Sequence, residues 1–236
     1  MRLTNSRAKY LSVSALLTIV GILFSGPVGL FIVKTSGEQP PWQSAKVFIE
    51  NYSPIQTMPY AFGFLLVAGF LLFFASLVNA GKDEQKPLEM MGLTLAIVFG
   101  SLISFNYIIQ VAYIPNALDQ NEAILSFLTM ANPKSLVWAT EMFGYAILGL
   151  ATIVVAPLFS GGGLQKIIKW LLILNGVASI AGAVAVAFDL SAVLSAPAMI
   201  GYYFWNILIA VIMVLIIVQF RFGNIPLSQH GNDTAS

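Results

Sequence analysis

The stretch "ANPKSLVWATEMFGYAILGLATIVVAPLF" (Ala131–Phe159) is predominantly apolar from Leu136 onward, yet it contains one acid, Glu141. An apolar run of about 20 residues is long enough for a helix to cross a hydrocarbon core of about 30 Å. Glu141 lies roughly 8 Å inside the beginning of that helix. A carboxyl group facing lipid at such a depth is costly, by about 2.5–3.5 kcal/mol on insertion scales. We therefore expect Glu141 to face the protein interior.

The rest of the chain has the same character. Of its 236 residues, 58% are hydrophobic and only 9% are charged, against about 25% charged residues in soluble domains. This composition predicts an all-α, polytopic membrane protein with six transmembrane helices, because only helices or closed barrels satisfy the backbone in lipid. We place the six helices at Tyr10–Val33, Tyr60–Val78, Met91–Ala112, Leu136–Phe159, Ile167–Phe188 and Ala198–Phe220.

The distribution of Lys and Arg predicts the orientation of these helices. If the N-terminus is inside, the inner side carries Arg2, Arg7, Lys9, Lys82, Lys86, Lys166, Lys169 and Arg221, and the outer side carries Lys34, Lys46 and Lys134. Cytoplasmic loops of membrane proteins are enriched in these residues. We therefore expect both termini to be cytoplasmic, with one transmembrane domain over residues 1–223 and a polar cytoplasmic tail over residues 224–236.

Polar side chains recur in the predicted outer half of the bundle. Trp138 and Tyr145 share a helical face with Glu141, and three further helices carry polar residues at a similar depth. Polar groups inside membranes need partners, so we expect one shared cluster. The candidate ligand-binding residues are Asn106, Gln110, Tyr113, Trp138, Glu141, Tyr145, Asp189, Tyr202 and Asn206. The alternative is that these amides and tyrosines only join helices to one another.

The sharpest prediction is that Glu141 lies opposite Asn106, Gln110 or Asn206. Since burial disfavours the charged form of a carboxyl group, we expect Glu141 to hold a proton for much of the time. Exchange of that proton when a solute arrives would make transport proton-coupled.

Three local patterns predict further features. Pro27 should kink the first helix, because proline lacks the backbone N–H of a helix interior. Residues 42–52 and 121–130 should form short helices lying along the interface or covering an outward-facing cavity. The small residues in 175–187 should place the fifth membrane helix at the centre of the bundle.

Several function classes are excluded or disfavoured. The chain has no cysteine, and its one histidine, His230, lies in the polar tail. Thiolate metal sites, haem ligated by a membrane histidine and a Ser–His protease are therefore unavailable. We identify no catalytic residue, metal site or cofactor. A net charge of +1 gives no reason to expect nucleic acid as a partner.

Three functions remain after these exclusions. The first is a transporter, channel or ligand sensor for a small solute or ion. The second is a membrane enzyme acting on a lipid or apolar substrate, with Glu141 as general acid or base and Tyr145 or Tyr202 assisting. The third is a structural or accessory subunit. The expected partners are the lipid bilayer and a small solute, ion or lipid, and association with a second copy stays open.

The segments "NPKSLVWATEMFGYAILG" and "FSGGGLQKIIKWLLILNG" resemble those of a broad set of uncharacterised bacterial six-helix membrane proteins. The resemblance covers roughly the second half of the chain. It implies a multi-pass protein of the bacterial inner membrane and no particular activity, and no functional residue follows from it.

Overall fold

The computed structural model describes residues 5–37, 39–119 and 121–222, and every regular element in these ranges is helical. The predicted all-α fold is confirmed for this part of the chain. Arg2, His230 and the predicted tail lie outside the described residues. The α-helices are α1 (Asn5–Ser25), α2 (Pro27–Gly37), α3 (Ala45–Glu50), α4 (Met58–Leu77), α5 (Lys86–Ile108), α6 (Ile114–Asn116), α7 (Glu122–Leu128), α8 (Leu136–Val155), α9 (Leu164–Phe188) and α10 (Ala196–Ile217).

Short 3₁₀ and π-helical turns extend or connect these helices. They are η1 (Pro54–Thr57), η2 (Asp83–Gln85), η3 (Ile109–Tyr113), η4 (Ala156–Leu158), η5 (Leu190–Leu194) and η6 (Val218–Phe222). Together the turns and helices make six segments long and apolar enough to cross a membrane, as the sequence predicts. These segments are Ser6–Gly37, Pro54–Leu77, Asp83–Asn116, Leu136–Leu158, Leu164–Phe188 and Ala196–Phe220.

The first membrane segment is broken where the kink is predicted. Helix α1 ends at Ser25 and α2 begins at Pro27, with Gly26 in a turn between them. Pro27 has no N–H to donate to the carbonyl of Leu23, four residues earlier, so the helical hydrogen bonding is interrupted. It resumes when Leu30 N donates to Gly26 O at 2.9 Å.

The six segments pack side by side in a closed ring. Along this ring α1 contacts α4, α4 contacts α5, α5 contacts α8, α8 contacts α9, α9 contacts α10, and α10 returns to α1. Fully buried aromatic rings fill the interior of this ring of helices. They include an edge-to-face pair of Phe70 and Phe99, whose ring centroids lie 5.8 Å apart.

The prediction that the fifth membrane helix is central is wrong. Helix α9 lies on the ring and exposes large side chains such as Trp170 and Phe188. Its small residues serve one contact instead. A Cβ atom at Gly176 would lie 2.5 Å from the carbonyl oxygen of Gly149 in α8, so glycine allows the two backbones to approach closely. The opposite face of α9 exposes large apolar side chains.

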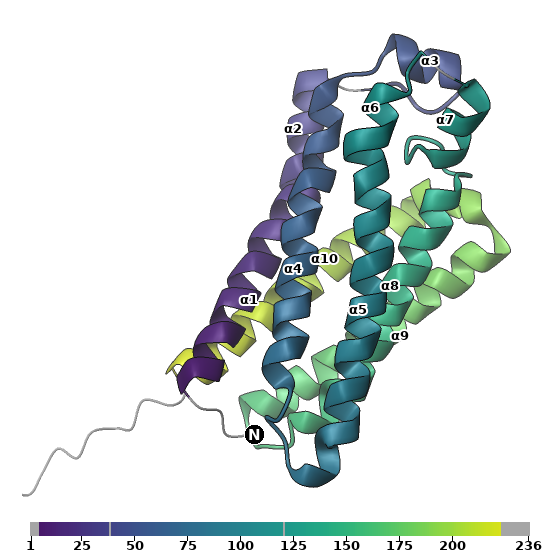
Figure 1. Ribbon diagram of the computed structural model, residues 1–236. Coiled ribbons are helices and arrows are strands. Elements are labelled where there is room, and N and C mark those ends of the chain that lie inside the picture. Colours follow the sequence, from purple (N-terminus) through teal and green to yellow (C-terminus); the bar gives the residue numbers. More distant parts are fainter. Residues whose placement is uncertain (1–4, 38, 120, 223–236) are drawn as a thin grey trace, which may run out of the picture.

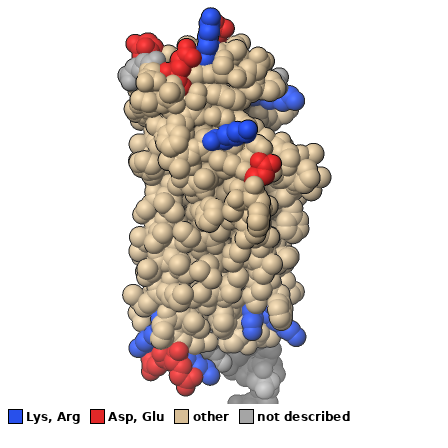
Figure 2. Space-filling model, turned by 90° about the vertical axis from the view of Figure 1, so that its right-hand side faces the viewer, with Lys and Arg blue, Asp and Glu red and all other residues tan. Residues whose placement is uncertain are grey.

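On the face shown in Figure 2, the exposed charged side chains lie toward the two ends of the bundle. Figure 2 shows Lys, Arg, Asp and Glu at both ends of one face, with a broad band of other residues between them. The turns from α4 to α5 and from α8 to α9 lie at the same end as the start of α1 (Figure 1). This arrangement agrees with the charge pattern from which we predict the orientation, and the orientation itself stays a prediction.

The opposite end is covered by a cap, which we define as α3, α6, α7 and the loop 129–135 (Figure 1). Helix α3 begins at the N-cap Ser44 and α7 at the N-cap Asn121, whose Oδ1 accepts from Ala123 N at 2.8 Å. Phe48 and Leu125 are buried in an apolar cluster that is separate from the main core. The predicted short helices are therefore confirmed.

Candidate functional site

Glu141 lies in the second turn of α8 with only 6% of its surface exposed. Asn106 Nδ2 of α5 donates to Glu141 Oε2 at 3.0 Å, and Tyr107 OH donates to Glu141 Oε1 at 3.2 Å. Each carboxyl oxygen therefore has a hydrogen-bond donor. The prediction that Glu141 faces the interior opposite Asn106 is confirmed.

The polar contacts extend one turn along α8. The hydroxyl oxygens of Tyr107 and Tyr145 lie 3.2 Å apart and share a hydrogen bond in which either can be the donor. Asn106 Nδ2 also donates to Val137 O at 2.8 Å, which joins α5 to the backbone of α8. We call Asn106, Tyr107, Glu141 and Tyr145 the acid cluster.

Tyr107 is the member of the acid cluster that the sequence prediction missed. It is 4% exposed and its ring lies against α4, where a Cβ atom at Gly63 would come within 2.2 Å of Tyr107 Cε2. The missing side chain of Gly63 therefore makes room for the ring. The sequence does contain a feature that could have identified Tyr107. It directly follows Asn106 within a membrane span, where a buried tyrosine hydroxyl requires a hydrogen-bond partner.

The acid cluster has no cationic partner among the residues that the structure describes. The one ion pair found in them joins Lys86 Nζ and Asp83 Oδ1 at 2.8 Å, on the exposed α4–α5 connection. Two buried polar atoms also lack a hydrogen-bond partner, namely Oδ1 of Asn106 in the cluster and Nε1 of Trp205, whose ring packs against Tyr145. A bound ligand could supply the missing countercharge for Glu141 and hydrogen-bond partners for the unpaired polar atoms.

Gln110 and Trp138 form their hydrogen bonds with the cap and not with Glu141. Gln110 Nε2 donates to Leu128 O at 2.8 Å, and Gln110 Oε1 accepts from Met130 N at 3.1 Å. Trp138 Nε1 donates to Met130 O at 2.8 Å. The prediction that Gln110 faces the cluster assumed regular α-helical spacing after Asn106. The π-turn η3 begins at Ile109 and changes that spacing.

Tyr202 and Asn206 lie against the break between α1 and α2. Asn206 Nδ2 donates to Tyr202 O within α10 at 2.7 Å. A Cβ atom at Gly26 would lie 2.5 Å from Asn206 Oδ1 and 3.0 Å from Tyr202 OH. These two residues therefore pack on the helix break, and neither forms a hydrogen bond with Glu141 in the described structure.

Tyr113 and Asp189 lie outside the acid cluster. Tyr113 is 38% exposed. Asp189 is exposed, and its Oδ1 accepts from Ser191 Oγ at 2.6 Å and from Ser191 N at 3.0 Å, which caps η5. These hydrogen bonds hold the pKa of Asp189 below its ordinary value. In the described structure Asp189 therefore caps a helix end.

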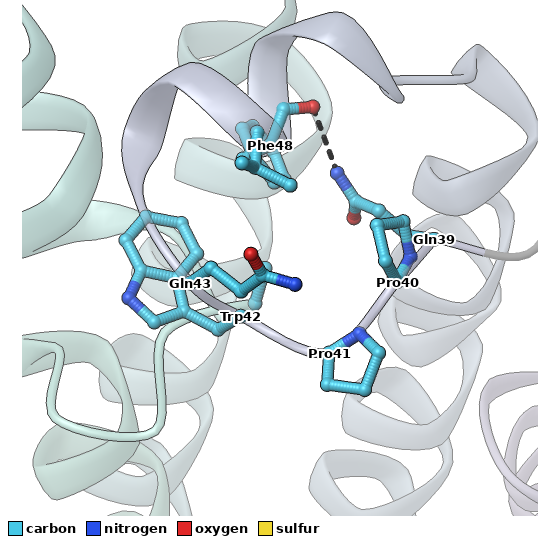
Figure 3. A pocket seen from close by; sticks show the side chains of 8 residues that line it. Gln39, Pro40, Pro41, Trp42, Gln43 and Phe48 are labelled. Atoms are coloured by element: carbon cyan, nitrogen blue, oxygen red, sulfur yellow. Dashed lines mark hydrogen bonds between the residues drawn. The ribbon is translucent and has the colours of Figure 1, made fainter.

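A shallow hollow of about 160 Å³, a volume that includes open solvent, lies on the cap. Figure 3 shows it beside Trp42, with Gln39 Nε2 donating to the carbonyl oxygen of Phe48 at 2.9 Å. Its lining residues carry no ionisable group. The described residues also contain no group of three or more His, Cys, Asp or Glu that could hold a metal ion. The acid cluster therefore remains the candidate site.

Comparison with known proteins adds no assignment. No protein-family model matches the chain, and no curated protein or solved structure matches it either. The resemblance to bacterial six-helix membrane proteins, and the inner-membrane location that it implies, therefore stay predictions from the sequence.

Proposed function

We propose that this chain is a multi-pass membrane protein in which the acid cluster binds a small solute or ion, and that Glu141 exchanges a proton with it. The observation that carries the proposal is the buried Glu141 carboxyl group, held by Asn106 and Tyr107 and unpaired with any cation in the described structure. The proposed setting is the inner membrane of a cell, with both termini on the cytoplasmic side.

The energetics of this group favour a proton-exchange role. Each hydrogen bond to Glu141 contributes about 1.5–3 kcal/mol when the carboxyl group is charged and less when it is neutral. Removing a carboxylate from water costs several kcal/mol, and two donors do not cancel its charge. A proton neutralises the group in the empty site, and a bound cation or solute takes over that role in the loaded site. Tyr107 and Tyr145 provide hydroxyl groups that can pass the proton along.

The cap gives such a site a route of access. Gln110 lies one turn beyond Asn106 and bonds to the cap on both sides of residue 129. Release of these two hydrogen bonds, together with the one from Trp138 Nε1 to Met130 O, would free loop 129–135. We therefore assign the cap the role of a cover over the acid cluster, which is the lid that the sequence suggests.

An infrared pH titration of the protein in lipid bilayers tests the proton-exchange role. We expect a carboxylic-acid C=O band that titrates with pH and disappears in Glu141→Gln. The matched control is Glu50→Gln, which removes an exposed acid at the end of α3. If no titrating band differs between the wild type and Glu141→Gln, the proposal is refuted.

The structure also favours one alternative, in which the acid cluster only joins α5 to α8 in a structural or accessory subunit. Both carboxyl oxygens of Glu141 are already hydrogen-bonded, as a helix-joining role requires. This alternative expects Glu141→Gln to change the stability of the protein, with no effect on proton exchange or solute binding. Melting temperatures measured beside the infrared titration separate the two functions.

A further inference from the structure

Aromatic side chains from four different helices gather around the acid cluster. They are Tyr60 of α4, Tyr107 of α5, Tyr145 of α8 and Trp205 of α10. The ring centroids of Tyr60 and Tyr107 lie 5.9 Å apart, and those of Tyr145 and Trp205 lie 4.8 Å apart. Tyr107 and Tyr145 also share a hydrogen bond, so the four side chains form one continuous series of contacts, which reaches the carboxyl group of Glu141 through Tyr107 OH. We call these four residues the aromatic wall.

The wall and the acid together lack one component, which is a positive charge. Glu141 has no cationic partner among the described residues. Asn106 Oδ1, a hydrogen-bond acceptor, is buried and has no partner. No described lysine or arginine pairs with Glu141. A positive charge beside Glu141 would be attracted both by its carboxylate and by the neighbouring aromatic rings.

This combination selects one chemical class of ligand. A cation over an aromatic ring gains about 0.5–2 kcal/mol, and rings grouped as a cage recognise quaternary ammonium groups. Small inorganic cations such as Mg²⁺ and Ca²⁺ require several oxygen ligands, and the described residues contain no group of three or more His, Cys, Asp or Glu that could supply them. An organic ammonium ion carries apolar groups that pack on the rings and a charge that pairs with the carboxylate.

We infer that the acid cluster binds an organic monocation of the alkylammonium class, in exchange for a proton. This inference rests on the proposed function, whose site and proton exchange it uses. The neutral Glu141 carboxyl group releases its proton to water, and the resulting carboxylate pairs with the ammonium ion. One cation enters for each proton that leaves, so the net charge of the buried site is the same before and after binding.

The test uses wild-type protein in nanodiscs of phosphatidylglycerol, whose headgroup carries no cation. Choline is compared with its neutral isostere 3,3-dimethylbutan-1-ol by titration calorimetry, and released protons are followed with a pH dye in weak buffer. We expect choline to bind with release of one proton per cation, and the isostere not to bind. A parallel sample with phosphatidylethanolamine shows by competition whether a lipid headgroup supplies the ammonium group.

Variants then locate the binding. Glu141→Gln should weaken choline binding by more than about 100-fold, as loss of a buried charge partner does, and should abolish proton release. Trp205→Leu should weaken binding by about 2- to 30-fold, and Trp205→Phe, which retains a ring, by less. Trp170→Leu is the matched control, since Trp170 is 58% exposed on α9. Tyr60→Leu provides a second test of the wall if Trp205→Leu does not fold.

Three results would overturn the inference: equal binding of choline and the neutral isostere, no binding of choline, or binding that Glu141→Gln leaves unchanged. The proposed function can fail separately, because the infrared titration of Glu141 needs no solute. A titrating Glu141 without choline binding would leave a proton-exchanging site for another class of ligand. Choline binding without a titrating Glu141 would refute both.

Discussion

Replacing Gly63 by alanine should displace Tyr107 and damage the acid cluster. The new Cβ atom would lie 2.2 Å from Tyr107 Cε2 and 2.7 Å from both Cδ2 and Cζ. Atoms of a rigid ring packed in the core cannot absorb such an overlap without a shift of the ring or the backbone. A shifted ring loses the hydrogen bond from Tyr107 OH to Glu141.

The magnitude follows from three contributions. Overpacking of a core costs about 1–3 kcal/mol, and the lost hydrogen bond costs about 0.5–1.5 kcal/mol. Alanine regains about 0.5–1 kcal/mol of helix propensity over glycine. The net loss of stability is about 0.5–4 kcal/mol, which corresponds to a decrease in Tm of roughly 1–16 °C for a chain of this size.

The assay is thermal unfolding of the purified protein in one detergent, followed by tryptophan fluorescence. The matched control is Gly201→Ala in α10, where no atom lies within 4 Å of the added Cβ. This control should leave Tm unchanged or raise it slightly. A double-mutant cycle assigns the cause, because Gly63→Ala should cost much less in a Tyr107→Leu background than in the wild type. An unchanged Tm for Gly63→Ala, or an equal loss in both backgrounds, would refute the reasoning.

Three other substitutions test separate parts of the structure. Gln110→Leu removes two hydrogen bonds to the cap, so hydrogen exchange should accelerate in residues 128–135 and stay unchanged in α9. Equal exchange rates for residues 128–135 in the variant and the wild type would contradict the role of Gln110 in holding the cap. Asn175→Leu removes a bond to α8 and should change Tm with no effect on choline binding, whereas weaker binding would show that Asn175 belongs to the site. The pKa of Asp189 is lower in the folded protein than in the unfolded chain. Asp189 therefore stabilises the folded protein at pH values above the pKa that it has in the unfolded chain, and this stabilisation is lost as the pH falls through its pKa in the folded protein. The Tm advantage of wild type over Asp189→Asn should therefore shrink only at acidic pH, and an advantage independent of pH would contradict this.

The features that the sequence predicts best depend on composition and on the cost of burial. Six apolar runs predict six spanning segments, and Pro27 predicts the break in the first of them. The inward orientation of Glu141 follows from the cost of exposing an acid to lipid. Its partner Asn106 follows from the need of a buried amide for hydrogen bonds. Each of these predictions depends on the free-energy cost of placing a single residue in lipid, so none of them requires knowledge of how the helices pack.

The features that the sequence does not reveal depend on details of packing. Tyr107 reaches Glu141 because Gly63 leaves room on a neighbouring helix. The π-turn at Ile109–Tyr113 moves Gln110 from the cluster to the cap, and no residue pattern in that span indicates the turn. Such arrangements are decided between helices that are distant in the sequence.

Glu89 shows the same limit at the other end of the bundle. Glu89 lies between the predicted membrane helices Tyr60–Val78 and Met91–Ala112, yet it is 1% exposed in the first turn of α5. Its carboxylate accepts from Asn79 N and Gly81 N, both at 2.6 Å. Asn79 has a positive φ of 57°, and the resulting turn points these backbone groups at the acid.

The proposal that Glu141 exchanges a proton for a bound cation is tested most directly by an infrared difference spectrum. The spectrum is recorded on the protein in phosphatidylglycerol bilayers, at one pH, before and after addition of choline. We expect loss of a carboxylic-acid band and gain of a carboxylate band, both absent from Glu141→Gln. Choline binding that leaves the carboxyl bands of the wild type unchanged would contradict proton exchange at Glu141.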